Sequence, residues 1–246
     1  ALEVARSLRD AGVRLRHPLE VVDFLSEEPS DYGVSTVGSR AMVGTLSPEM
    51  LARTNPAGET LGAAIARMGG RPEALTAPLR RPGEVAAFLE MHIEQGPLLE
   101  REGVPIGVVT GIVGIHRYRV SVEGRPDHAG TSPMRLRRDA LAAAAEVILA
   151  VERAARAAAA RDAFVGTVGR IENAPNNPNV VPGRTELWVE LRSLQPEMLW
   201  SVWDEVRGAV EEMARRRGLN WTDEVVSTAP PVLCDDRDRK STRLNS

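Results

Sequence analysis

The sequence predicts an α/β fold in two parts. Residues 19–25, LEVVDFL, form a mixed apolar run, which is typical of a strand that is covered on both faces of a sheet. Residues 117–123, RYRVSVE, alternate instead between apolar and polar side chains, which indicates a half-buried strand. Because the two strand types differ, we expect a first domain over residues 1–113 and a second over residues 114–226.

The composition is that of an ordinary globular protein. The 246 residues are 43% hydrophobic and 26% charged, which suits one large domain or two smaller ones. The formal net charge of −3 argues against nucleic acid as a partner, and no apolar run approaches the roughly 18 residues that span a membrane. The single cysteine, Cys234, excludes an intrachain disulfide and a thiolate zinc cluster, and it fits a reducing, cytoplasmic location.

In the first domain the sequence predicts, in chain order, helix 1–12, strand 19–25, a loop over 29–46, helices 47–54 and 57–69, and strand 84–92. The helices follow from apolar residues at helical spacing, and the loop follows from its proline and glycines. The pair Gly69-Gly70 ends the last helix. Both strands end at candidate site residues, because Glu27 and Glu28 follow the first and His92 closes the second. Open α/β sheets place their sites at such strand ends.

In the second domain the sequence predicts strand 117–123, a long Ala-rich helix over 137–160, strands 164–172 and 185–192, a helix from about residue 196, and strand 219–226. The last helix has Pro196 at a favoured first position and apolar residues along one face. Gly218 follows three arginines and marks the C-terminal end of this helix. The order β-α-β-β-α-β is the split βαβ, or ferredoxin-like, arrangement.

The two ends of the sequence are unusual. Ala1 stands within a helical pattern and is not an initiator methionine. Residues 227–237 are expected to begin a return to the first domain. Residues 238–246, DRKSTRLNS, resemble the translation of a common sequencing adapter. We therefore expect an artefact joined to a truncated gene, with a natural polar tail as the alternative.

Three short motifs carry candidate chemistry. They are Glu27-Glu28, His92-Ile93-Glu94-Gln95-Gly96 and His128-Ala129-Gly130-Thr131-Ser132-Pro133-Met134. A neutral imidazole at a strand end is a good ligand for a divalent metal. Adjacent residues that leave a strand point in different directions, so one carboxylate of the glutamate pair can bind metal while the other takes a proton from the bound water. Taken alone, these residues also fit a solvated acidic pair and ordinary core or surface histidines.

Together the three motifs resemble the M20 metallopeptidase clan, and within it the hydantoinase/carbamoylase family of amidases. The resemblance implies a partial zinc-peptidase-like catalytic domain over residues 1–113. It implies an inserted ferredoxin-like βαββαβ dimerisation, or lid, domain over residues 114–226. It also implies a homodimer and two divalent metal ions (zinc, manganese, cobalt or nickel) in the complete protein.

The resemblance implies a role for each candidate residue of the first domain. Glu27 corresponds to the general base, Glu28 to a metal ligand, and His92 to the imidazole ligand of the other metal. Gln95 is expected near the substrate, and a loop amide that bonds to backbone is the alternative. We expect the other ligands of the family, a histidine and a bridging aspartate upstream and a histidine downstream, to lie outside this sequence.

In the second domain, the resemblance implies that His128 reaches across the dimer interface and donates a hydrogen bond to the oxyanion at the attacked carbonyl. Asn179 and Arg192 are implied to hold the substrate carboxylate, since a guanidinium offers two parallel donors. A salt bridge at the strand end is the alternative for Arg192. Glu190 stands where the family more often has aspartate.

The implied activity is that of a dinuclear metal amidohydrolase that cleaves the carbamoyl or ureido C–N bond of a small substrate with a free carboxylate. An N-carbamoyl-L-amino acid is the first expectation for the substrate, and allantoate, a ureide, is the alternative. A different hypothesis is that the chain as given is a dimerising, ligand-binding fragment without catalysis. His17 and His116 match no motif and are expected to be surface or packing residues.

Overall fold

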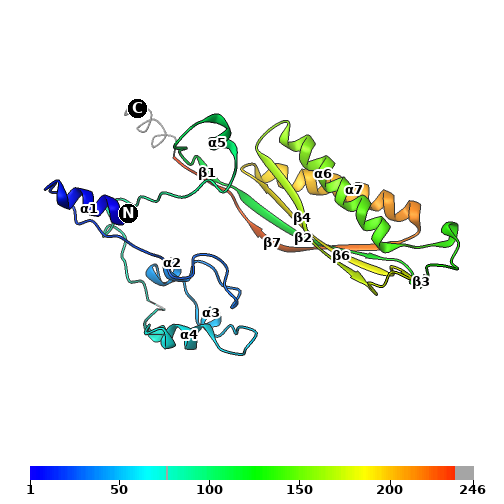
Figure 1. The fold of residues 1–246 in the computed structure, drawn as a ribbon, viewed down its shortest axis with the longest axis horizontal. Helices are drawn as coiled ribbons and strands as arrows, with labels where there is room; N and C mark the ends of the chain where they lie inside the picture. Colours follow the sequence, from blue (N-terminus) through cyan, green and yellow to red (C-terminus); the bar gives the residue numbers. More distant parts are fainter. Residues whose placement is uncertain (76, 236–246) are drawn as a thin grey trace. The chain divides into compact units, whose positions relative to one another are not determined.

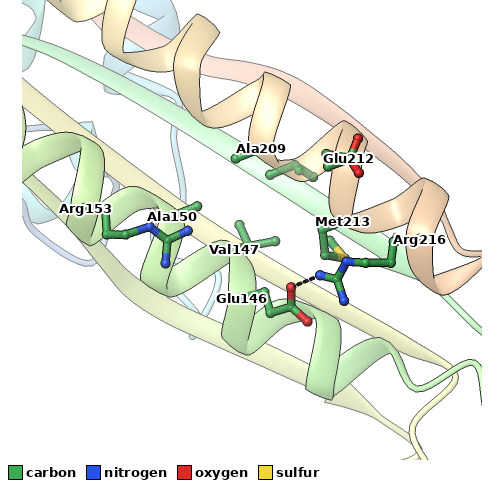
Figure 2. Close-up of a pocket in the computed structure, with 9 residues that line it drawn as sticks. Glu146, Val147, Ala150, Arg153, Ala209, Glu212, Met213 and Arg216 are labelled. Carbon is green, nitrogen blue, oxygen red and sulfur yellow. Dashed lines mark hydrogen bonds and ion pairs between the residues drawn. The ribbon is translucent and has the colours of Figure 1, made fainter.

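The computed structural model describes residues 1–75 and 77–235 (Figure 1). The chain divides into two compact units, one formed by Ala1–Gln95 and a second that begins at Gly96. The adapter-like segment 238–246 lies outside the described residues.

The first unit consists of short helices around a small apolar core. Its helices are α1 (Leu2–Asp10), α2 (Val37–Met42), α3 (Pro48–Leu51), α4 (Leu61–Arg67) and the 3-10 turn η1 (Pro72–Ala74). Its core consists of Val34, Val37, Ala41, Leu46, Leu61 and Ile65. Ser47 and Thr60 cap α3 and α4, because each hydroxyl accepts a hydrogen bond from the backbone N–H three residues further on. The three helices that the sequence predicts are therefore present in shortened form.

Three other expectations for this unit are wrong. Residues 19–25 and 84–92 form no strand, and the predicted loop over 29–46 contains α2. Leu19 is 51% exposed and Leu25 is 53% exposed, so the first apolar run is not a buried strand. A strand covered on both faces needs hydrogen-bonded neighbours, and the described residues pair neither segment into a ladder.

The two irregular segments nevertheless contact each other through side chains. Arg80, which precedes the second segment in the sequence, forms an ion pair of 2.6 Å with Glu20. Further along, the ring centroids of Phe24 and Phe88 lie 6.2 Å apart. The segments that precede Glu27-Glu28 and His92 are therefore neighbours, although they are not strands of one sheet.

The second unit is built on a four-stranded antiparallel sheet. Its strands are β2 (Gly114–Glu123), β4 (Phe164–Ala174), β6 (Arg184–Ser193) and β7 (Asn220–Ala229), in the spatial order β4-β6-β2-β7. The two long helices are α6 (Ala140–Ala159), between β2 and β4, and α7 (Pro196–Arg217), between β6 and β7. The predicted β-α-β-β-α-β order is confirmed, with strand and helix ends within a few residues of the predicted ones.

Shorter elements surround this sheet. They are α5 (Leu98–Glu102), β1 (Gly111–Ile112), β3 (Asp127–His128), η2 (Met134–Leu136), β5 (Val180–Val181) and β8 (Val232–Leu233). Strand β1 pairs with β8, and β3 pairs with β5, both antiparallel. These two small ribbons were not predicted from the sequence, because two-residue strands carry no periodic signal.

Helices α6 and α7 pack side by side on one face of the sheet (Figure 1). The side chains that face them from the two central strands are Tyr118, Val120, Val122, Leu187, Val189 and Leu191, all buried. Asp139 caps α6 by accepting from the N–H groups of Leu141 and Ala142. The opposite face of the sheet carries charged and polar side chains, and no described helix packs on it. Within the described residues, no helix combines the length and the apolar character needed to cross a bilayer.

Candidate functional site

The segment that carries Glu27 and Glu28 is held by its backbone. Three consecutive N–H groups of residues 36–38, where α2 begins, donate to the carbonyls of residues 25–27 at 2.8 to 3.1 Å. Gly38 permits this contact, because a Cβ there would lie 2.6 Å from a backbone nitrogen of the same segment. Both carboxylates are exposed. The acidic pair therefore combines a fixed backbone with accessible side chains.

His92 lies on an exposed segment outside regular structure. Its Nδ1 lies 2.5 Å from the carbonyl oxygen of Ile93. Since a carbonyl can only accept, Nδ1 carries the proton, and the lone pair of Nε2 is left for a metal. Gln95, also exposed, sits in a bend with a left-handed φ of 56°.

The donor types of Glu28 and His92 suit a divalent metal such as zinc, which binds imidazole nitrogen and carboxylate oxygen. Within residues 1–75 and 77–235, however, no three His, Cys, Asp or Glu side chains gather where they could hold an ion. A stable site of this type has three or four protein ligands. The described residues therefore offer single ligands to a metal and do not enclose one.

His128 and Asn179 lie side by side at one end of the second unit. His128 stands opposite Val180 in the β3–β5 ribbon. The N–H of Ala129 donates to the carbonyl of Asn179 at 2.8 Å. Both side chains are exposed, so an imidazole and an amide are available together at this point.

Arg192 lies near the other end of the same sheet. Strand β6 begins at Arg184, at the end of the sheet nearer to Asn179 in the sequence. Arg192 stands eight residues further along this strand, and eight strand residues span about 27 Å. One chain therefore does not bring Arg192 to His128 or Asn179. The reason is that the sequence spacing between Asn179 and Arg192 is mostly taken up by extended strand.

Glu190 fixes the guanidinium of Arg192 on the open face of the sheet. Nε and Nη2 of Arg192 each lie 2.6 Å from one oxygen of Glu190, and Nε of Arg117 lies 2.6 Å from the other. Partial burial raises the pKa of the Glu190 carboxyl, but the hydrogen bonds from Arg192 and Arg117 outweigh it and the pKa lies below its ordinary value. One carboxylate thus faces two guanidinium groups, so the cluster of Glu190, Arg192 and Arg117 carries a net positive charge.

The strand-end salt bridge, which was the alternative explanation for Arg192, is present in the structure. It uses one edge of the guanidinium and leaves the other edge for a second anion. Sequence reasoning missed Arg117 as a partner in this cluster. Its signal was the alternation over residues 117–123, which places Arg117 on the polar face and Tyr118 in the core.

Residues 1–238 match the family described as Peptidase family M20/M25/M40. The chain belongs to this family. It is 40% identical over 235 residues to the N-carbamoyl-L-amino acid amidohydrolase of Geobacillus stearothermophilus, covering 96% of this chain and 57% of that protein. It is 34% identical over 239 residues to a probable allantoate deiminase of Oryza sativa subsp. japonica, covering 90% of this chain and 49% of that protein.

Among solved structures of the M20 relatives, an amidase of the hydantoinase/carbamoylase family from Burkholderia multivorans has a TM-score of 0.83 and 36% identity. That match covers 99% of this chain and 58% of the other. The resemblance to hydantoinase/carbamoylase amidases is therefore confirmed. The chain spans about half the length of the curated relatives that it matches.

Proposed function

We propose that this chain is part of a metal-dependent amidohydrolase that cleaves the carbamoyl C–N bond of an N-carbamoyl-L-amino acid. The observation that carries the proposal is the 40% identity, over 96% of the chain, with an N-carbamoyl-L-amino acid amidohydrolase. In this proposal residues 1–113 are the partial catalytic domain, and residues 114–226 are the inserted lid domain that holds a homodimer together.

The substrate has two features that the chain can recognise, a free carboxylate and a carbamoyl carbonyl. The free edge of the Arg192 guanidinium gives the carboxylate two parallel donors, and Glu190 keeps that edge oriented. Asn179 adds an amide donor, and Gln95 of the first unit is proposed to contact the substrate as well. His128 donates to the oxyanion that develops as the carbonyl is attacked.

Glu28 and His92 would each contribute one ligand to a divalent metal, with the remaining ligands outside the described residues. When bound, the metal would supply a Lewis acid and a water of lowered pKa. Glu27 accepts the proton of the attacking water. Its exposed carboxylate on a fixed backbone suits that transfer, since a base must stay within hydrogen-bonding reach of the proton.

A complete substrate site requires two copies of the chain under this proposal. His128 and Asn179 lie at one end of the sheet and Arg192 near the other, with about 27 Å of strand between Arg184 and Arg192. A two-fold dimer brings the His128–Asn179 end of one copy to the Arg192 end of its partner. Two equivalent sites then form, each built from both chains.

Allantoate is the second candidate substrate, because a probable allantoate deiminase is 34% identical to the chain. It shares the free carboxylate and the ureido group, so the same residues would bind it. If the chain as given is instead a fragment without catalysis, it would dimerise and bind the carboxylate only.

The activity is tested by ammonia release in the complete gene product, supplied with zinc or manganese and given N-carbamoyl-L-amino acids or allantoate. Glu27→Gln should lower kcat by at least about a hundredfold without loss of bound metal, because it removes proton transfer and no ligand. The exposed Glu73 offers a matched control in Glu73→Gln, which should behave as wild type. Normal turnover in metal-loaded Glu27→Gln protein would refute the assignment of Glu27 as the base. The absence of turnover of either substrate by the wild type would refute the proposed function.

A further inference from the structure

The loop that carries His128 is organised around the imidazole ring. The backbone N–H of Gly130 lies 3.0 Å from Nδ1 of His128 and points to it as a hydrogen-bond donor. A backbone N–H can only donate, so Nδ1 must be the unprotonated nitrogen of a neutral ring. The proton then resides on Nε2, which faces away from this contact.

Arg137 holds the two sides of the same loop. Its Nη2 donates to the carbonyl of Ala129 at 2.6 Å, and its Nε donates to the carbonyl of Ser132 at 3.0 Å. The guanidinium therefore spans the residues on either side of Gly130. Arg137 is half-buried and lies between η2 and α6 in the sequence, so the loop is held by a residue of the segment that leads into α6.

A carboxylate secures the start of the loop. Asp127 accepts from the N–H of His128 at 2.9 Å and from the hydroxyl of Ser132 at 3.0 Å. Ser132 is 8% exposed, so this contact lies under the loop surface. The backbone on both sides of the imidazole is thus fixed before any ligand arrives.

We propose that Gly130 and Arg137 are positioning residues that fix His128 as a neutral donor through Nε2–H. This inference rests on the proposed function, in which His128 donates to an oxyanion. A donor of that kind needs its proton on the outward nitrogen and its ring in one orientation, because the stabilisation depends on donors that are aligned in advance.

Gly130 serves the ring by its small size as well as by its N–H. A Cβ at this position would lie 3.1 Å from Cε1 and 3.4 Å from Nδ1 of His128. Alanine would therefore press on the imidazole and lengthen the hydrogen bond that selects the tautomer. Arg137 cannot be replaced well by lysine, because a single ammonium lacks the planar fork that reaches two carbonyls at once.

The tautomer is measured directly by NMR of the ¹⁵N-histidine-labelled chain, which has four histidines. At mildly alkaline pH, His128 should show a pyridine-type Nδ1 and a pyrrole-type Nε2. Arg137→Lys and Gly130→Ala should each shift the ring toward a mixture of both tautomers. Arg135→Lys is the matched control, because Arg135 is exposed in η2, and it should leave the pattern unchanged.

His116 provides an internal check of folding in the same spectra. Its Nδ1 lies 3.0 Å from the hydroxyl of Tyr118 in the buried core of the second unit. Unchanged His116 signals show that a variant has kept this core. A proton on Nδ1 of His128 in the wild type would overturn the proposal, and so would an unchanged tautomer in both Arg137→Lys and Gly130→Ala.

Turnover measurements on the complete gene product distinguish the positioning role of Arg137 from the proposed role of His128. Arg137→Lys should lower kcat by about ten- to a hundredfold with little change in KM, as a misplaced catalytic group does. Full activity in His128→Ala would refute the role of His128 itself, whatever the NMR shows. If His128→Ala is inactive while Arg137→Lys turns over at the wild-type rate, the positioning role is overturned and the role of His128 stands.

Discussion

Two inactive variants of the complete protein are expected to restore each other's activity as a mixed dimer. In one chain Arg192 lies about 27 Å of strand from Arg184, which is at the His128 end of the sheet, and this is beyond the reach of any side chain. In a heterodimer of Glu27→Gln and His128→Ala chains, one site carries both defects and the other carries neither. Random re-association gives about half heterodimers with one working site each, so the mixture should recover about one quarter of wild-type activity in a two-fold dimer.

The assay purifies the heterodimer through two different affinity tags and measures ammonia release per dimer, with about half of the wild-type value expected. The matched control is a heterodimer of Glu27→Gln with Glu28→Gln. Both of these residues belong to the same chain's part of the site, so every site keeps one defect and no activity should return. An inactive heterodimer of Glu27→Gln with His128→Ala, verified by both tags, would place His128 in its own subunit's site and refute the reasoning.

Three further results are expected. Arg192→Lys should raise KM about ten- to a hundredfold for substrates with a free carboxylate and spare their amides, as the loss of a charge-assisted hydrogen bond predicts, whereas Arg184→Lys should not discriminate between acid and amide. Burial lowers the pKa of His116 below its ordinary value of 6.5, so the unfolded state takes up a proton at a higher pH than the folded state. The free energy of unfolding should therefore fall as the pH drops below about 6.5. Urea denaturation at several pH values should show a smaller pH dependence in His116→Gln and an unchanged one in His17→Gln. Calorimetric titration of this chain with zinc should give binding too weak to saturate stoichiometrically, because no three ligands gather among the described residues, and tight binding of two ions would contradict that.

The second unit could be predicted closely because its signals are local. Helix α7 combines a proline at its start, one apolar face and a glycine just beyond its end, and the structure places it at Pro196–Arg217. Strand β6 alternates buried residues with half-buried ones after its exposed first residue, Arg184. The type and the ends of each element could therefore be predicted from its own hydrophobic periodicity and its own terminal residues.

The first unit could not be predicted in this way. The run over 19–25 has the composition of a central strand, but strand formation depends on neighbours that a single segment does not encode. In the structure Phe24 of this run contacts Phe88 of the segment over 84–92 through their rings, and no ladder pairs the two segments among the described residues. Composition therefore indicated which segments belong together and missed how they are paired.

The candidate site shows the same division between local and distant information. The short motif around His128 predicted a functional loop, and the structure shows that its glycine contacts the imidazole directly. The pairing of Asn179 with Arg192 is only a spacing in sequence. Whether two residues at such a spacing can bind one ligand depends on the path of the chain between them. Here most of that path is the extended strand β6, which keeps Asn179 and Arg192 apart.

The local balance of charge explains why a substrate carboxylate would select Arg192 on the open face of the sheet. Other arginines on this face each have a carboxylate partner of their own, in the pairs Arg119–Glu224, Arg170–Glu172 and Arg184–Glu186. Glu190 is shared between Arg192 and Arg117, so an incoming anion displaces no complete ion pair there. Of these two, Arg192 stands between Ile115 and Val165 on the adjacent strands, so its strand neighbours add no competing carboxylate. Under the proposed function, the choice of Arg192 for the carboxylate would therefore depend on the sharing of one glutamate as much as on the arginine itself.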